Sequence, residues 1–316
     1  MTENNVEPEL RSTIAVLGLG PMGRALAAAA LTGGHPTVVW NRTPEKAQAF
    51  VAQGAVLAPT AADAVRGASI AVVCMINYGA VRASVADIAD WPTGTLVNLS
   101  SGHAGEARAM AGWAAQRGIS YLDGAILTPA PTVGTRAATI LYSGPRSLFD
   151  RSRALLEAFG TSVYLGDDIG IGSAYEMALL DLFAMSVGGL AHAFALAIAE
   201  GIEPAAFARF AKGIGGLLPD MADRFADQLA VGRFPAEVSS IASAGSAVAH
   251  VSAAAAARGI DTTTLQAVQR IIGRAAAAGY GGDSYARLAQ FLAEADHADA
   301  SAELATPKPS LPQLSH

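Results

Sequence analysis

Cysteine and charge are both scarce in this chain of 316 residues. Its one cysteine, Cys74, excludes an internal disulfide and a cysteine-based metal cluster. Cys74 lies in the apolar run 70–75, where we predict a buried strand and a packing role for the thiol. The six histidines lack metal-ligand spacing and no GxSxG turn follows a strand, so we expect neither a metal nor a serine nucleophile.

Charged residues make up only 15% of the chain, against 52% hydrophobic residues, and the net charge is -6. Lysine and arginine are scattered, so there is no basic stripe for a run of phosphates, and nucleic acid is not expected as a partner. The apolar surplus is more than one monomer comfortably hides, which predicts a homo-oligomer.

A signal peptide is also lacking, because the tail 1–12 is polar and acidic, and this predicts a cytoplasmic protein. Residues 177–199 could be mistaken for a membrane span, but Asp181 and His192 interrupt them. We predict a helix buried between subunits there, and no membrane association. The tail 300–316 carries three prolines amid polar residues and is predicted to be disordered.

Short β-branched runs alternate with Ala-rich stretches from residue 13 to about 170. This pattern predicts a doubly wound, Rossmann-like α/β domain with a parallel sheet joined by helical crossovers. The predicted strands are 13–17, 37–40, 55–57, 70–75, 95–99, 120–122, 139–142 and 162–165.

The character changes after Asp167 and Asp168, either of which can cap a helix start. Long Ala- and Leu-rich segments then predict an all-α domain over 171–299. Its first helix, at about 172–200, would be roughly 43 Å long, enough to link the domains and build a dimer core.

A GxGxxG motif follows the first predicted strand and opens a helix, the context that indicates a dinucleotide site. Its residues are Gly18, Leu19, Gly20, Pro21, Met22 and Gly23. Gly18 permits the tight turn, Gly20 lets the backbone approach the pyrophosphate, and Gly23 allows close packing of helix on strand.

The end of the second strand lacks the acid with which NAD-binding proteins hold the ribose hydroxyls. It has Asn41, Arg42 and Thr43, and Arg42 can pair with a 2′-phosphate. We therefore predict NADPH (NADP⁺) as the cofactor. Alternatively, Thr43 caps the helix that Pro44 opens while Arg42 is solvated, and Thr43 can do both.

Two loops lie at the carboxyl edge of the predicted sheet, where ligands bind in open α/β folds. The first, Ile76-Asn77-Tyr78, directly follows Met75 at the end of a predicted strand, and the second is Asn98-Leu99-Ser100-Ser101-Gly102. We predict that they border the nicotinamide ribose and the substrate, although such residues are equally turn formers.

The succession of an NADP domain, a long helix and a helical domain resembles the β-hydroxyacid dehydrogenase superfamily. That resemblance implies a catalytic lysine on the long helix, at a position where this chain has Ala178. Asp181 shares a helix face with Ala178. A Leu-Leu-Asp-Leu-Phe run around Asp181, the run 189–194 and the segments 97–99, 122–126, 249–250, 257–259 and 278–283 together resemble the imine reductase and reductive aminase family.

The resemblance implies an NADPH-dependent reduction of a cyclic imine or iminium, with reductive amination of a ketone by an amine as an extension. It also implies a homodimer with interleaved helical domains and an active site shared between the subunits. Small residues around Ala244, where many family members carry larger ones, suggest a roomy, weakly polar pocket. We place Tyr175, Met177, Leu180, Met221, Phe225 and Ala244 in its wall.

Imine reduction needs a cationic electrophile when hydride arrives, and a carboxylate serves that need. Asp181, to which we add Asn98 as a second catalytic residue, would either hold a proton for the imine nitrogen or stabilise the iminium by charge. A buried Asp satisfied by a neighbouring helix is the structural alternative. His192 and Tyr175 are not neighbours of Asp181 on its helix face, and neither is assigned as a proton relay.

Two rival functions remain. A true β-hydroxyacid dehydrogenase is disfavoured by Ala178 and by the lack of a basic cluster for a substrate carboxylate. The second rival is a protein that binds NADPH without turnover. The first predicts oxidation of hydroxyacids, and the second predicts no turnover with either substrate class.

Overall fold

The computed structural model describes residues 12–88, 91 and 94–294, so the predicted tails, 1–12 and 300–316, lie outside it apart from Ser12. The chain divides into two compact units, of which the first ends at Ala184 and the second begins at Met185.

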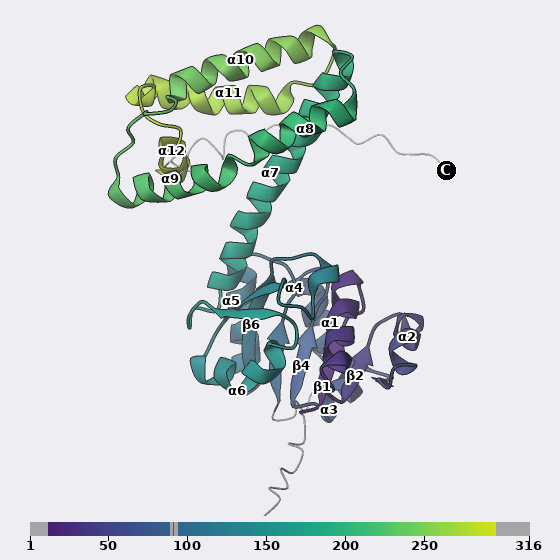
Figure 1. Ribbon diagram of the computed structural model, residues 1–316. Helices are drawn as coiled ribbons and strands as arrows, with labels where there is room; N and C mark the ends of the chain where they lie inside the picture. Colours follow the sequence, from purple (N-terminus) through teal and green to yellow (C-terminus); the bar gives the residue numbers. More distant parts are fainter. Residues whose placement is uncertain (1–11, 89–90, 92–93, 295–316) are drawn as a thin grey trace, which may run out of the picture. The chain divides into compact units, whose positions relative to one another are not determined.

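An eight-stranded sheet forms the centre of the N-terminal unit, and every predicted strand is present in it (Figure 1). The strand order is β3-β2-β1-β4-β5-β6-β7-β8. β1 pairs in parallel with both β2 and β4, so Ile14 lies between Thr37 and Ile70. The strands are β1 (Ile14–Leu17), β2 (Thr37–Trp40), β3 (Val56–Leu57), β4 (Ile70–Val73), β5 (Thr95–Asn98), β6 (Ser120–Ile126), β7 (Thr139–Ser143) and β8 (Thr161–Tyr164).

The predicted parallel pairing of the strands is wrong at one position in the sheet. β6 and β7 run antiparallel, with Asp123 opposite Ser143. A parallel pair needs a crossover of a dozen or more residues, usually a helix. The segment between these strands contains only the 3₁₀ turn η2 (Ala130–Thr132), which cannot supply one.

Helices cover both faces of the sheet because its strands are apolar on both sides. Ile14 and Val16 of β1 pack in one cluster, with residues of α1 and α6, whereas Ala15 and Leu17 pack in another, with residues of α3, α4 and α5. The helices of this unit are α1 (Pro21–Thr32), η1 (Pro44–Ala47), α2 (Gln48–Val51), α3 (Ala61–Arg66), α4 (Tyr78–Val85), α5 (Ala104–Ala115) and α6 (Arg146–Leu156).

The long helix α7 spans Ile171–Ala199, 29 residues, and begins in the N-terminal unit. Of the two predicted capping residues, only Asp168 lies at its start, where the carboxylate accepts from the Gly170 N–H at 3.1 Å. Asp167 instead accepts from the Arg146 N–H and the Tyr164 hydroxyl. By length and composition α7 could cross a membrane.

The C-terminal unit is helical, as predicted, and has a small core. Ile241, Ile272, Ala275 and Leu288 form its buried cluster, where α10 and α11 run side by side (Figure 1). Its helices after α7 are α8 (Pro204–Gly215), α9 (Leu218–Val231), α10 (Ile241–Ala257), α11 (Thr263–Ala275), η3 (Ala276–Tyr280) and α12 (Arg287–Glu294).

Candidate functional site

The glycine-rich turn has the backbone geometry that its motif predicts. Gly18 has φ +98°, and a Cβ added there would lie 2.3 Å from the Cys74 carbonyl oxygen. A Cβ on Gly23 would lie 1.9 Å from the Gly18 carbonyl oxygen, so helix and strand touch at this point. At Gly20 the same atom would meet nothing within 4 Å. The turn therefore leaves open space at the N-terminus of α1, where a pyrophosphate binds in such folds.

A cavity of about 830 Å³ extends from this turn along the carboxyl edge of the sheet. It lies between β1 and β4, where the strand order reverses and where open α/β sheets bind their ligands. Its lining residues include Gly18, Gly20, Pro21, Met22, Gly23, Asn41, Arg42, Thr43, Lys46, Thr60, Cys74, Met75, Ile76, Ser84 and Asp87.

The end of the cavity near β2 carries groups that suit a 2′-phosphate. Asn41 joins this end to the glycine turn, because its Oδ1 accepts from the Leu19 N–H at 2.9 Å and its Nδ2 donates to the Thr43 carbonyl at 2.9 Å. Thr43 occupies the N-cap position of η1 but makes no side-chain capping bond, whereas Arg42 is exposed, as the alternative expected. Arg42 and the neighbouring Lys46 supply cationic side chains.

Lys46 was missed in the sequence. A 3₁₀ turn, with three residues per turn, begins directly after Thr43, and this places Lys46 on the cavity wall together with Thr43. The Pro-Glu-Lys run after Thr43 indicated a helix start, but it did not show which type of helix would follow.

Four residues predicted to bind cofactor or substrate shape the edge of the sheet but do not line the cavity. Leu19 is buried. Asn77 caps α4 by accepting from the Ala80 N–H at 2.9 Å, and the Ser100 hydroxyl accepts from the Met75 N–H at 2.9 Å. Asn98 is fully buried, where its amide donates to the Tyr121 hydroxyl at 3.2 Å and accepts from the Ser100 N–H at 3.1 Å.

Cys74 departs from the predicted buried strand. β4 ends at Val73, and Cys74 is half-buried and lines the cavity. Burial, and then the Glu176 carboxylate, raise the pKa of the thiol to about 12. Cys74 therefore forms part of the cavity wall with a thiol that is protonated at neutral pH.

A buried carboxyl group, Asp123, lies in β6 at the same edge of the sheet and is not exposed at all. It accepts from the hydroxyls of Tyr78 (2.7 Å), Tyr121 (2.5 Å) and Ser173 (2.9 Å). Burial raises the pKa of Asp123 to about 6, and hydrogen bonds from the three hydroxyls act in the opposite direction. In the sequence Asp123 belongs to the segment 122–126, which carries the family resemblance, but its partners could not be identified there.

Asp181 and Ala178 are both exposed on α7. Neither unit by itself therefore forms, within its described residues, the apolar cavity expected around Asp181. Tyr175 and Leu180 are also exposed on this helix, and Met177 is half-buried.

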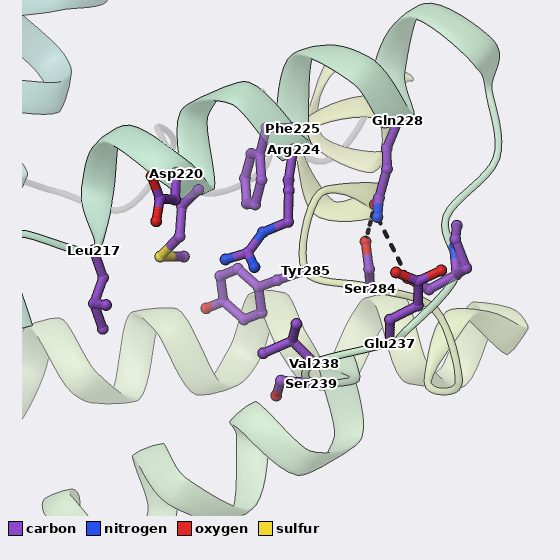
Figure 2. A pocket seen from close by; sticks show the side chains of 12 residues that line it. Leu217, Asp220, Arg224, Phe225, Gln228, Glu237, Val238, Ser239, Ser284 and Tyr285 are labelled. Carbon is purple, nitrogen blue, oxygen red and sulfur yellow. Dashed lines mark hydrogen bonds between the residues drawn. The ribbon is translucent and has the colours of Figure 1, made fainter.

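A second cavity, of about 340 Å³, lies within the C-terminal unit (Figure 2). Met221 and Phe225 of α9 line it together with Leu217 and Tyr285. Figure 2 shows the Arg224 guanidinium pointing toward the Tyr285 ring. Ala244 is half-buried on α10 and does not line this cavity. Neither unit by itself assembles all six predicted pocket residues.

His192 is half-buried, and its Nε2 lies 3.1 Å from the Asp261 carbonyl oxygen. This bond gives the imidazole a structural role and agrees with its exclusion as a proton relay. Among the described residues, no group of three His, Cys, Asp or Glu side chains could hold a metal ion.

Both halves of the chain match known families. Residues 13–166 match the NAD-binding domain of 6-phosphogluconate dehydrogenase, and residues 168–294 match the C-terminal domain of NADPH-dependent reductive aminase-like proteins. An NADPH-dependent reductive aminase of Aspergillus oryzae is 31% identical over 291 residues, which cover 88% of this chain and 96% of that protein.

Solved structures resemble the chain over nearly its whole length. An imine reductase from Myxococcus stipitatus in complex with NADP⁺ is 33% identical, has a TM-score of 0.85, and covers 89% of this chain and 99% of its own. A reductive aminase from Aspergillus terreus in complex with NADPH4, cyclohexanone and allyl amine is 29% identical, with a TM-score of 0.83 and the same coverage.

Proposed function

The chain belongs to the family of NADPH-dependent reductive aminases and imine reductases, and from this premise we propose that it reduces a cyclic imine or iminium to an amine. It is an NADPH-dependent oxidoreductase acting on C=N bonds. The substrate class is inferred from one observation on α7. Ala178 stands where a dehydrogenase would need a lysine, and the carboxylate of Asp181 lies on the same helix face. Reduction of an iminium needs a negative or proton-donating partner for its nitrogen, which Asp181 provides.

The cofactor cavity fits NADPH. Open space at Gly20 admits the pyrophosphate to the N-terminus of α1. Arg42 and Lys46 would hold the 2′-phosphate, with Thr43 as a neutral partner. Met75 and Ile76 line the opposite end of the cavity, beyond β4. When bound, NADPH supplies the hydride that reduces the carbon of the C=N bond.

We assign Asp181 as the group that acts on the substrate nitrogen. In its protonated form the carboxyl group would deliver a proton, and in its ionised form it would pair with the cationic nitrogen. Asn98 would act through Ser100 and Tyr121 rather than by touching the substrate, because its amide is fully buried.

A homodimer in the cytoplasm completes the proposal. Phe183 of α7 is 65% exposed, and Phe210 and Ile214 of α8 are 78% and 71% exposed. Burial of such side chains at about 25 cal/mol per Å² is a sufficient reason for association. A second copy would cover α7 and enclose Asp181, with Met221 and Phe225 in the apolar wall of the substrate pocket.

Substrate tests separate this proposal from its rivals. In one assay the protein is mixed with a substituted pyrroline and NADPH, and the oxidation of NADPH is followed. In the other, the same preparation is mixed with 3-hydroxyacids and NADP⁺, and the reduction of NADP⁺ is followed. Imine-dependent oxidation supports the reductase. Reduction of NADP⁺ by hydroxyacids alone would return the chain to the dehydrogenases, and cofactor binding without any turnover would favour a binding protein. Cyclohexanone with a small amine tests the extension to reductive amination.

Asp181→Ala tests the catalytic assignment. We expect kcat to fall at least roughly tenfold, with NADPH affinity nearly unchanged, because only stabilisation of the reacting nitrogen is removed. Steady-state kinetics and NADPH fluorescence titration measure the two quantities. Unchanged turnover would refute the role of Asp181.

A further inference from the structure

Two buried carboxyl groups of the N-terminal unit are not explained by cofactor binding. Asp123 is fully buried in β6, and Glu176 of α7 is 7% exposed. Neither lines the cofactor cavity. Burial of a carboxylate is costly unless hydrogen bonds compensate for lost water, so each has a structural or functional reason to be there.

Both carboxyl groups link the first two turns of α7 to the carboxyl edge of the sheet. The Ser173 hydroxyl donates to Asp123 at 2.9 Å, and the Tyr78 hydroxyl lies 3.0 Å from the same Ser173 oxygen. Three residues along α7, Glu176 accepts from the Ser101 hydroxyl at 2.6 Å. Residues three apart lie on one face of a helix, so α7 is held at two points on one side.

The groups around Asp123 are hydroxyls from different elements. Tyr78 comes from α4, Tyr121 from β6 and Ser173 from α7. Burial, and then the Asp123 charge, raise the pKa of both phenols, so they remain donors. Glu176 is the nearby charged side chain that affects Asp123, and it has the same sign. The three hydroxyls donate directional hydrogen bonds to one acceptor, Asp123, and none of them carries a positive charge. Their main effect is therefore to fix the position of α7, and not to neutralise the carboxylate.

The hydrogen bonds that Ser173 and Glu176 make to the sheet unit's edge lie close to Asp181 along the helix. Glu176 precedes Asp181 by five residues, about 7.5 Å along the axis. At about 100° per residue, a helix fixed at Ser173 and Glu176 has a fixed rotation, and the direction of the Asp181 side chain follows from it. A displacement of about 1 Å at a reacting group can lower a rate about a hundredfold.

We propose that Asp123 and Glu176 are positioning residues that hold α7 against the sheet edge and thereby set where Asp181 meets the substrate nitrogen. This inference rests on the proposed function, because it needs Asp181 to act in the chemical step. Neither carboxyl group touches the substrate. Their effect reaches the reaction through the rotation and axial position of one helix.

A double-mutant cycle between Glu176 and Asp181 tests the inference. Glu176→Ala should lower kcat about tenfold with little change in NADPH affinity, whereas Glu176→Gln, which keeps an acceptor for Ser101, should retain most of the activity. In the Asp181→Ala background, Glu176→Ala should lower the remaining rate less than about twofold. Single-turnover reduction of a pyrroline at excess enzyme measures these rates.

Hydrogen exchange supplies a second readout that needs no turnover. Amides in the first turns of α7 should exchange faster in Glu176→Ala than in the wild type, in the protein without cofactor. Thr37→Val is the matched control, because Thr37 is 3% exposed and its hydroxyl donates to the His35 carbonyl, away from α7. This control should change neither exchange in α7 nor the coupling to Asp181.

The two possible failures are distinguishable. Equal losses from Glu176→Ala in both backgrounds, or unchanged exchange in α7, would overturn the positioning role while a large effect of Asp181→Ala keeps the proposed function. No effect of Asp181→Ala on turnover would overturn both. If Glu176→Ala does not fold, the same cycle is made with Ser101→Ala, which removes the donor to Glu176, and equal losses in the two Asp181 backgrounds overturn the inference.

Discussion

The two units of this chain differ in how much apolar surface each buries by itself. The sheet unit has large clusters on both faces, with side chains such as Phe149 and Leu122 completely buried. The cluster of the helical unit has four buried residues, while Phe210 and Ile214 are more than two-thirds exposed. In a parallel sheet the helices that connect the strands cover both apolar faces. A layer of helices has no such cover of its own, so its apolar face must pack against another surface.

The difference also separates the functional residues. The cofactor cavity lies entirely in the sheet unit, so its walls are in place in the single chain. The proposed substrate residues are spread over α7 and the helical unit, and Asp181 is exposed. We infer that the cofactor site is formed by folding and that the substrate site is formed by assembly.

Gly23→Ala should have the largest effect, because it tests the close packing of the sheet unit. The added Cβ would collide with the Gly18 carbonyl oxygen, and overpacking against backbone costs about 3 kcal/mol or more of unfolding free energy. Urea unfolding measures this loss of unfolding free energy. Gly20→Ala is the matched control, since its Cβ meets no protein atom. That variant should keep its stability and lose NADPH affinity at least about tenfold. Equal destabilisation of the two variants would contradict this account.

Asp123→Asn tests the electrostatic cost of burial in the same unit. Burial raises the pKa of Asp123 from 3.8 to about 6, so between these pH values the folded protein binds more protons than the unfolded chain. The Asp123 contribution to stability is therefore greatest at low pH and is lost as pH rises through about 6. The stability of wild type minus that of Asp123→Asn should fall by roughly 2 to 3 kcal/mol from about pH 4 to pH 7.5. A constant difference would show that Asp123 is not desolvated.

Protein concentration tests the incompleteness of the helical unit. If its exposed apolar side chains are covered by a second copy, stability contains an association term, and a roughly hundredfold dilution should cost about 2.7 kcal/mol. Thermal unfolding at several concentrations, together with light scattering, measures this. A monomer whose melting temperature is independent of protein concentration would show that no second copy covers the apolar side chains of the helical unit.

Arg42→Ala should have the smallest effect and sharpens the description of the cofactor site. Loss of one cationic partner of the 2′-phosphate should narrow the preference for NADPH over NADH about tenfold, with kcat for NADPH nearly unchanged. Lys46→Ala should narrow it less, because an ammonium makes no bidentate contact. Ratios of kcat/KM for the two cofactors decide this, and an unaltered ratio in both variants would mean that the phosphate is recognised elsewhere.

The fold class was predictable because its causes are local. Alternating runs predicted all eight strands, and the glycine motif predicted a turn whose φ at Gly18 is +98°. The antiparallel pairing of β6 and β7 was not predicted, although the absence of a helical run between them was available as a signal. Lys46 joined the cavity through a 3₁₀ turn whose type depends on packing, which periodicity does not show.

By itself the sequence determined the succession of elements, the dinucleotide turn, the preference for NADPH and the presence of Asp181 on the helix face of Ala178. These follow from periodicity, from the steric freedom of glycine and from charge, which neighbouring residues in the chain already specify. Only the tertiary structure decided that Asp123 meets Ser173, fifty positions away, and that Asn98 is buried instead of lining the site. Contacts of that kind depend on which strands and helices become neighbours in space, and directional hydrogen bonds form only once those backbones are packed.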